Sequence, residues 1–227
     1  DPSEAFSRKD DAMAQTMTPS EPMTPGQIAK LCEVLAAALR KVGFPKDQVQ
    51  QVLETQGDAL AAEMVGALRR QVESSLVLFP KGTTTMTLAE RHDPALYYKI
   101  RNGLYVWSDF RTRIVAKATP VEAGTTVEVG YADLGKNATD AEIEAALPTR
   151  HLFDEPAVCA IVAALIARQP EGKEGVLMNN GYANLFYISS CVVRVRWLAV
   201  NRGWDVRTWL RDDYGWGAGG RVFSPAN

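Results

Sequence analysis

The sequence predicts a mixed α+β fold, an antiparallel sheet with helices, preceded by an α-helical hairpin. Apolar residues recur at helical spacing in two N-terminal segments, residues 24–43 and 45–73. From residue 104 onward, short alternating or apolar runs are separated by Gly, Pro and Asn, and two helices, residues 139–148 and 154–170, interrupt them. Strands, two helices and further strands in that order indicate an α+β domain of about 130 residues.

The two N-terminal helices have well-defined boundary residues. Thr24 is the predicted N-cap, Pro25 suits the first helical position, and Gln27 completes a capping box. Gly43 ends the first helix and Pro45 opens the second. The predicted apolar stripes comprise Ile28, Leu31, Cys32, Leu35, Leu39 and Val42 in the first helix, and Val49, Val52, Leu53, Leu60, Met64, Leu68 and Val72 in the second.

Residues 24–75 are therefore predicted to form a helical hairpin. Two helices alone bury too little apolar surface to be stable. Either they dock on the rest of the chain or they pair with the same segment of another chain. We favour the second interpretation, a homo-oligomer formed through these helices.

The second predicted domain spans about residues 95–227. Its first strands are "LYVWSDF" from Leu104 and "TTVEVGY" from Thr125, and its helices are capped by Thr139 and Asp154. The helix after Asp154 is apolar nearly all round and is predicted to be buried. The runs "GVLMNNGYANLFYI", "CVVRVRWLAV" and "WDVRTWL" complete an antiparallel sheet.

Two segments have no assigned element. Residues 76–95 contain "KGTTTMT", which fits either a loop or a weak strand. Residues 1–23 are polar, have no apolar core of the kind found in signal peptides, and are predicted to be flexible.

The composition is typical of a soluble globular protein, with 46% apolar residues, 23% charged residues and a formal charge of −2. So small a net charge gives no overall attraction to nucleic acid or membranes, and no run approaches the ~18 apolar residues of a membrane helix. Cys32, Cys159 and Cys191 are odd in number and scattered, which argues against a disulfide framework. We therefore expect a reducing compartment and a cytoplasmic protein.

The sequence gives little support for catalysis or metal binding. His92 and His151 are the only histidines, and neither has ligand-like spacing to cysteines or carboxylates. Cys159 is predicted to fill the core, and Cys191 begins a strand. Neither a phosphate-binding loop nor a dinucleotide fingerprint is present. We expect no enzyme activity, no cofactor and no metal.

The last 49 residues, 179–227, have an unusual composition. They contain no Lys, Glu, Gln or Met, although about ten would be expected from the frequencies in residues 1–178. Six arginines and three aspartates leave the segment with three surplus positive charges. Four tryptophans recur through it: Trp197, Trp204, Trp209 and Trp216.

Strand periodicity divides this segment into two faces. The predicted inward residues are Val193, Val195, Trp197, Trp204 and Val206, and the predicted outward residues include Arg194, Arg196, Leu198, Asp205 and Arg207. An ordinary half-buried sheet explains this alternation but leaves the missing Lys and Glu unexplained. Arginines interleaved with aromatic residues are typical of both nucleic-acid-binding and protein-binding surfaces.

At these residues the chain resembles the variable proteins of diversity-generating retroelements, which have a C-type-lectin fold. The resemblance rests on "NGYANLFY", the Val-x-Val-x-Trp of residues 193–197, "RGW" at residues 202–204, and "W-x-A-G-x-R-V-F-S" at residues 216–224. The predicted order of elements from Leu104 onward also fits that fold. The carbohydrate-binding calcium motif of true lectins is absent, so the resemblance does not imply sugar binding.

The resemblance accounts for the composition of residues 179–227. In such systems a reverse transcriptase copies a template with errors at adenines, and the copy replaces the 3′ end of the gene. The tryptophan codon TGG has no adenine and is fixed. A diversified AAC codon yields codons ending in C, which cannot encode Lys, Glu, Gln, Met or Trp.

The resemblance thus implies a non-enzymatic protein that binds a macromolecule, with protein the favoured ligand, through a mutable face on a rigid scaffold. The scaffold residues would be Trp197, Trp204, Trp209 and Trp216. The expected ligand-binding residues are Ser190, Arg194, Arg196, Leu198, Val200, Asn201, Asp205, Arg207, Leu210, Asp212 and Asp213.

Two alternatives are a nucleic-acid-binding protein that uses the Arg/aromatic tail, and an enzyme related to the formylglycine-generating oxidases. The latter would need a reactive cysteine pair, for which Cys159 and Cys191 lack a recognisable context.

Overall fold

The computed structural model describes residues 22–99, 103–211 and 215–226. The sequence predicts that residues 1–23 are flexible, and residues 1–21 of that segment lie outside the described part. The chain divides into two compact units, which we describe separately. The helical unit ends at Ser74, and the unit that contains the sheet begins at Ser75.

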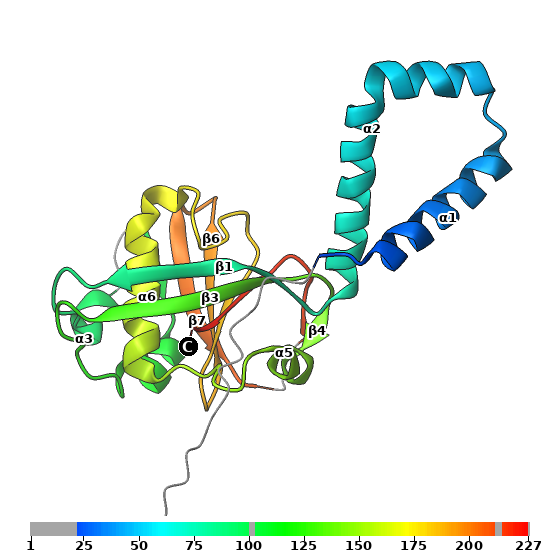
Figure 1. Cartoon of the computed structure of the whole chain (residues 1–227). Helices are drawn as coiled ribbons and strands as arrows, with labels where there is room; N and C mark the ends of the chain where they lie inside the picture. The colour runs from blue at the N-terminus through cyan, green and yellow to red at the C-terminus, as the bar shows by residue number, and fades with distance from the viewer. Residues whose placement is uncertain (1–21, 100–102, 212–214, 227) are drawn as a thin grey trace, which may run out of the picture. The chain divides into compact units, whose positions relative to one another are not determined.

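The helical unit contains α1 (Pro25–Val42) and α2 (Lys46–Ser75), at the positions that the sequence predicts (Figure 1). The capping box of α1 is present: the Gln27 N–H donates to Thr24 Oγ1 over 3.3 Å, and the Thr24 N–H donates to Gln27 Oε1 over 2.8 Å. Gly43 follows α1 with φ 70°, a left-handed conformation that glycine adopts without strain. Both helices are described throughout, and no residue in them is buried.

A sheet of seven strands organises the described part of the second unit, in the order β1-β3-β9-β5-β6-β7-β2. The strands are β1 (Leu78–Thr87), β2 (Leu104–Val106), β3 (Thr126–Leu134), β5 (Asn184–Tyr187), β6 (Val192–Leu198), β7 (Gly203–Trp209) and β9 (Arg221–Pro225). A separate antiparallel pair consists of β4 (Ala138–Thr139) and β8 (Gly215–Trp216). The helical segments are α3 (Pro94–Tyr97), α4 (Ser108–Phe110), η1 (Arg111–Val115), α5 (Asp140–Ala146), α6 (Glu155–Arg168) and η2 (Pro170–Gly172). The predicted α+β class is confirmed.

Three details differ from the prediction. β1 pairs with β3 along its whole length, so the sheet begins at Leu78, before the predicted domain start at residue 95. The predicted strand "LYVWSDF" ends at Val106, because the chain turns there into α4 and η1. The sheet is not wholly antiparallel, since β5 pairs with β9 and β2 pairs with β7 in parallel. Parallel neighbours require long crossover connections, which local alternation does not reveal.

Both faces of the sheet bury apolar side chains. On one face, α6 covers a core in which the rings of Phe186 and Phe223 stack with centroids 4.4 Å apart (Figure 1). The predicted burial of the helix after Asp154 is confirmed, since eight of its residues are buried. On the other face, Leu185, Tyr187 and residues of α5 form a smaller core. On β6 and β7 several side chains of this second face are only half-buried, as at Arg196 and Arg207.

Candidate ligand-binding face

Five of the eleven expected ligand-binding residues lie on β6 and β7, namely Arg194, Arg196, Leu198, Asp205 and Arg207, and β7 is next to the edge strand β2. The register places Arg194 opposite Arg207 and Arg196 opposite Asp205. β2 pairs with β7 in parallel and sets Tyr105 beside Asp205. Directly paired residues project to the same side of a sheet, so these side chains share one face. We call this the outer face and define it by Tyr105, Trp107, Arg194, Arg196, Leu198, Asp205 and Arg207.

The opposite side of the same strands holds the predicted scaffold. Trp197 pairs with Trp204, and Val195 pairs with Val206. The two tryptophans are 9% and 2% exposed, and their rings meet edge to face with centroids 5.3 Å apart. The Nε1–H of Trp204 also donates to the carbonyl oxygen of Gln169 over 3.5 Å. The predicted inward orientation of these residues is confirmed.

The other two tryptophans contact the smaller core. Trp216 is buried, and its Nε1–H donates to the buried carboxylate of Asp140 over 2.6 Å. Trp209 is half-buried and lies opposite Val192, with its ring 6.4 Å from that of Trp216. The guanidinium of Arg194 lies 5.7 Å from the Trp209 ring. Trp209 therefore borders the outer face and is not part of the main core.

The structure exposes some of the expected ligand-binding residues and covers others. The exposed ones are Ser190, Val200, Asn201 and Leu210, the half-buried ones are Arg194, Arg196, Leu198 and Arg207, and Asp205 is buried. Asp212 and Asp213 lie outside the described residues. The half-buried group is brought together on the outer face. Val200 and Asn201 occupy the turn at one end of β6 and β7, and Ser190 and Leu210 lie at the other end.

The expectation that Asp205 is exposed is wrong. Alternation does place it on the outer face, but its side chain is 2% exposed. One carboxylate oxygen accepts the Nε1–H of Trp107 over 2.5 Å. The other accepts Nη2–H of Arg194 over 2.8 Å and Nε–H of Arg207 over 3.2 Å. Asp205 therefore anchors the outer face, because its neighbours cover it from three sides.

Trp107 is a residue of this face that the sequence did not identify. It follows β2, is 49% exposed, and lies 98 residues before its partner Asp205. The guanidinium of Arg207 stacks over its ring, 4.1 Å from the centroid. Trp107 is the one tryptophan of five that precedes residues 179–227. Its isolated position beside a polar run is the sequence feature that could have indicated a role for it.

The outer face carries more positive than negative charge. Three guanidinium groups, those of Arg194, Arg196 and Arg207, surround the single carboxylate of Asp205. The Nε atoms of Arg194 and Arg196 are buried and have no hydrogen-bond partner. Burial lowers the pKa of Arg194, the hydrogen bond to Asp205 opposes this effect, and the positive charges of Arg207 and Arg196 lower the pKa further.

A hollow of about 390 Å³ adjoins the buried carboxylate. It is lined by Tyr105, Val106, Trp107, Ser108, Arg111, Leu198, Asn201 and Asp205. Aromatic, aliphatic and polar groups thus meet at one concave place, which is typical of binding surfaces.

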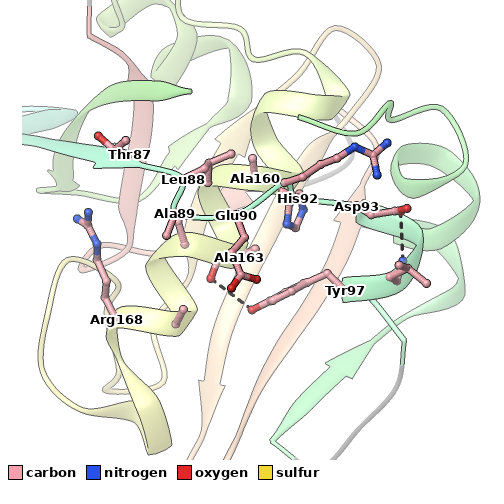
Figure 2. A pocket seen from close by; sticks show the side chains of 14 residues that line it. Thr87, Leu88, Ala89, Glu90, His92, Asp93, Tyr97, Ala160, Ala163 and Arg168 are labelled. Carbon is pink, nitrogen blue, oxygen red and sulfur yellow. Dashed lines mark hydrogen bonds between the residues drawn. The ribbon is translucent and has the colours of Figure 1, made fainter. Parts of the chain in front are cut away.

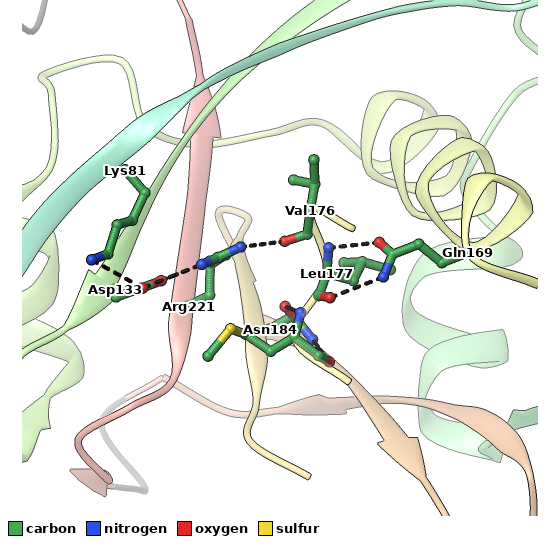
Figure 3. A network of polar contacts seen from close by, with 8 residues as sticks. Lys81, Asp133, Gln169, Val176, Leu177, Asn184 and Arg221 are labelled. Carbon is green, nitrogen blue, oxygen red and sulfur yellow. Dashed lines mark hydrogen bonds and ion pairs between the residues drawn. The ribbon is translucent and has the colours of Figure 1, made fainter. Parts of the chain in front are cut away.

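The other arginines of the tail have structural partners. Arg221 lies between Asp133 and the carbonyl oxygen of Val176, with contacts of 2.7 Å to each (Figure 3). Arg211 donates to Glu144, and Arg202 pairs with Glu171 on the surface. In the same network as Arg221, Gln169 and Asn184 bind the backbone of Leu177 and Met178 and hold this segment against the sheet (Figure 3).

A second hollow, of about 570 Å³, lies between the end of β1 and α6 (Figure 2). Small residues of α6, among them Ala160 and Ala163, form its floor. At its rim Tyr97 donates to the carbonyl oxygen of Ala163 over 3.3 Å, and Arg168 donates to that of Thr85 over 3.1 Å, whereas Nε2 of His92 is buried without a hydrogen-bond partner among the described residues.

The residues considered for catalysis are dispersed. All three cysteines are free, and burial raises the pKa of Cys159 to about 12, so this thiol stays protonated at neutral pH. Cys191 is also buried, and burial raises its pKa. Burial lowers the pKa of His92. Among the described residues, no group of three or more His, Cys, Asp and Glu side chains could hold a metal ion.

Comparison with family models, with curated proteins and with solved structures gives no match to this chain. Within the described residues, no helix combines the length and the apolar character that crossing a membrane requires.

Proposed function

We propose that this chain is a ligand-binding protein whose outer face contacts a macromolecule, and that a retroelement diversifies this face. A C-type-lectin-like fold for the sheet-containing unit is part of the proposal. The observation that carries it is the division of β6 and β7. Buried aromatic residues occupy one side, and mixed half-buried residues occupy the other. Rigid inward residues would allow the outward ones to change without unfolding the domain.

The composition of residues 179–227 supports the same proposal. An ordinary solvated face carries Lys and Glu, and both are absent from this segment. Copying errors confined to adenines would leave such a composition, with tryptophan at positions that cannot change.

A protein ligand is favoured over nucleic acid because of how the arginines are used. Arg202, Arg211 and Arg221 pair with acidic residues outside the tail, so only three arginines remain for the outer face. Asp205 offsets one of those three charges. Salt-dependent binding to a polyanion typically uses about 6–10 phosphate contacts. On the outer face, Arg lies beside Trp and Tyr, and these three residue types are enriched in protein-binding hot spots.

We also propose that α1 and α2 pair with a second copy of the chain. Most of their apolar side chains are exposed, among them Leu39 at 56% and Leu53 at 51%, and neither helix contains a buried residue. Pairing two such hairpins would bury both stripes and would give each oligomer more than one outer face, which increases avidity.

Sequencing the DNA that flanks the gene tests the retroelement part of the proposal. We expect a near-copy of the segment that encodes residues 179–227, differing from it at adenines, beside a reverse transcriptase gene. Flanking DNA that contains neither element would contradict diversification, although the outer face would still be available for a fixed ligand.

A further inference from the structure

The chemistry of the outer face indicates what group its ligand presents. Arg196 forms no ion pair within the described chain, although it lies on β6 directly opposite Asp205. Both oxygens of that carboxylate are already bound by Trp107, Arg194 and Arg207. The Nε of Arg196 is buried without a partner, so this cation is partly removed from water without an ion pair of its own.

We propose that the outer face binds a carboxylate group of a protein ligand, and that the guanidinium of Arg196 is its principal partner. The inference rests on the proposed ligand-binding function and names the chemistry of the ligand. Three guanidinium groups against one carboxylate leave the face with about two uncompensated charges, which a side chain of Asp or Glu would reduce. A planar guanidinium matches the two oxygens of a carboxylate and forms strong, oriented hydrogen bonds with them.

The surroundings of Arg196 favour a carboxylate that belongs to a protein. Trp107, half exposed, stacks on Arg207, which holds that guanidinium in place before any ligand arrives. Val200 is 97% exposed and Leu210 is 46% exposed at the two ends of the strands, so apolar contacts would flank the charged centre. Burial, and after it the positive charges of Arg207 and Arg196, lower the pKa of Arg194 although Asp205 is bound to it, which agrees with an excess of positive charge on this face.

The test uses the full chain, labelled with ¹⁵N, and NMR detection of the arginine Nε–H signals. The probes are a hexaglutamate peptide, a hexaglutamine peptide of equal length, inorganic phosphate and a single-stranded oligodeoxynucleotide, all at one ionic strength set with chloride. We expect hexaglutamate to shift the Arg196 Nε–H signal saturably and hexaglutamine to leave it in place. If the Arg196 Nε–H signal does not shift with hexaglutamate, or shifts equally when only chloride is added, the inference is overturned.

Two variants separate recognition by Arg196 from general charge attraction. Arg196→Lys keeps the charge but loses the planar fork, and we expect it to weaken hexaglutamate binding about tenfold. Arg150→Lys changes an exposed arginine outside the face and should bind as the unaltered chain does. Equal affinity of the Arg196→Lys variant and the unaltered chain would overturn the inference.

The remaining probes decide between ligand classes. Tighter binding of the oligodeoxynucleotide than of hexaglutamate, lost in Arg196→Lys, would overturn the carboxylate inference in favour of nucleic acid. Tighter binding of phosphate than of hexaglutamate would likewise overturn it. If no anion binds but variation of the exposed outer-face residues still produces protein binders, the ligand-binding function stands and the carboxylate inference fails alone.

Discussion

At the residue scale, the outer face depends on Asp205. Its carboxylate holds Arg194 and Arg207 in place and accepts the indole N–H of Trp107, so one side chain links β6, β7 and the residue that follows β2. A change at this position therefore affects both the stability of the domain and the shape of its candidate binding surface.

We expect Asp205→Ala to lower the free energy of unfolding by about 3 kcal/mol, because two largely buried guanidinium groups lose their only carboxylate. Glu171→Ala is the matched control, since it removes an exposed ion pair with Arg202 and should cost less than about 0.5 kcal/mol. Denaturant midpoints measure both. Similar losses in the two variants would show that Asp205 has no anchoring role.

The scaffold should respond to mutation differently from the exposed positions. Trp204→Ala removes a ring that is 2% exposed and should cost about 3–5 kcal/mol of unfolding free energy. Val200→Ala, at 97% exposure, should stay within about 0.5 kcal/mol. Urea unfolding followed by tryptophan fluorescence would separate the two, and a small loss for Trp204→Ala would contradict the rigid scaffold.

Sequence periodicity was sufficient to assign Trp197 and Trp204 to the core, because alternate residues of a strand always face opposite sides. It was insufficient for Asp205. Asp205 is covered in part by Trp107, which is 98 residues away in the chain and reaches the site only through tertiary folding.

At the scale of elements, the outer face requires β2 to lie close to β7. Gly203, in the "RGW" segment, makes this approach possible: a Cβ atom there would lie 2.4 Å from the ring of Tyr105 and 3.1 Å from the carbonyl carbon of Gly103. Any larger residue would push β2 away from β7 and change the hollow beside Asp205.

We therefore expect Gly203→Ala to destabilise the domain by about 1–3 kcal/mol, as overpacking does. Gly57→Ala is the control: it lies within α2 with no atom near its added Cβ, and should stabilise the helix by roughly 0.5–1 kcal/mol. Thermal unfolding measures both effects. A neutral Gly203→Ala variant would show that β2 and β7 need not approach so closely.

The elements that the sequence predicted best are those with local boundary residues. Thr24, Thr139 and Asp154 each cap a helix at the expected place, because capping depends on residues within one turn. The parallel pairs of β2 with β7 and of β5 with β9 depend on contacts distant in sequence, and no local pattern contains that information.

At the scale of the whole molecule, the helical unit is the part for which we propose a partner. Two amphipathic helices form as predicted, but neither buries a residue within the described chain. Exposed apolar stripes of this length are unfavourable in water, which motivates the proposed pairing of two chains.

We expect light scattering coupled to size-exclusion chromatography to give at least twice the chain mass of 24.9 kDa. Leu53→Asp places a charge in the apolar stripe of α2 and should shift the protein toward a single chain, whereas Gln51→Asp, at an exposed polar position on the opposite side of the helix, should not. An unaltered protein that elutes with the mass of one chain would contradict the proposed pairing.

The central claim is that the outer face can change its ligand without loss of fold, and two displayed libraries test it most directly. One randomises Arg196, Leu198, Val200, Asn201 and Leu210; the other randomises Val193, Val195, Trp197, Trp204 and Val206 on the opposite side of the same strands. Folded display and binding to an immobilised protein such as lysozyme are scored for both. We predict that the first library stays folded and yields binders, and that the second loses folded display. A first library that folds but never binds, or a second that folds and binds equally well, would contradict the account.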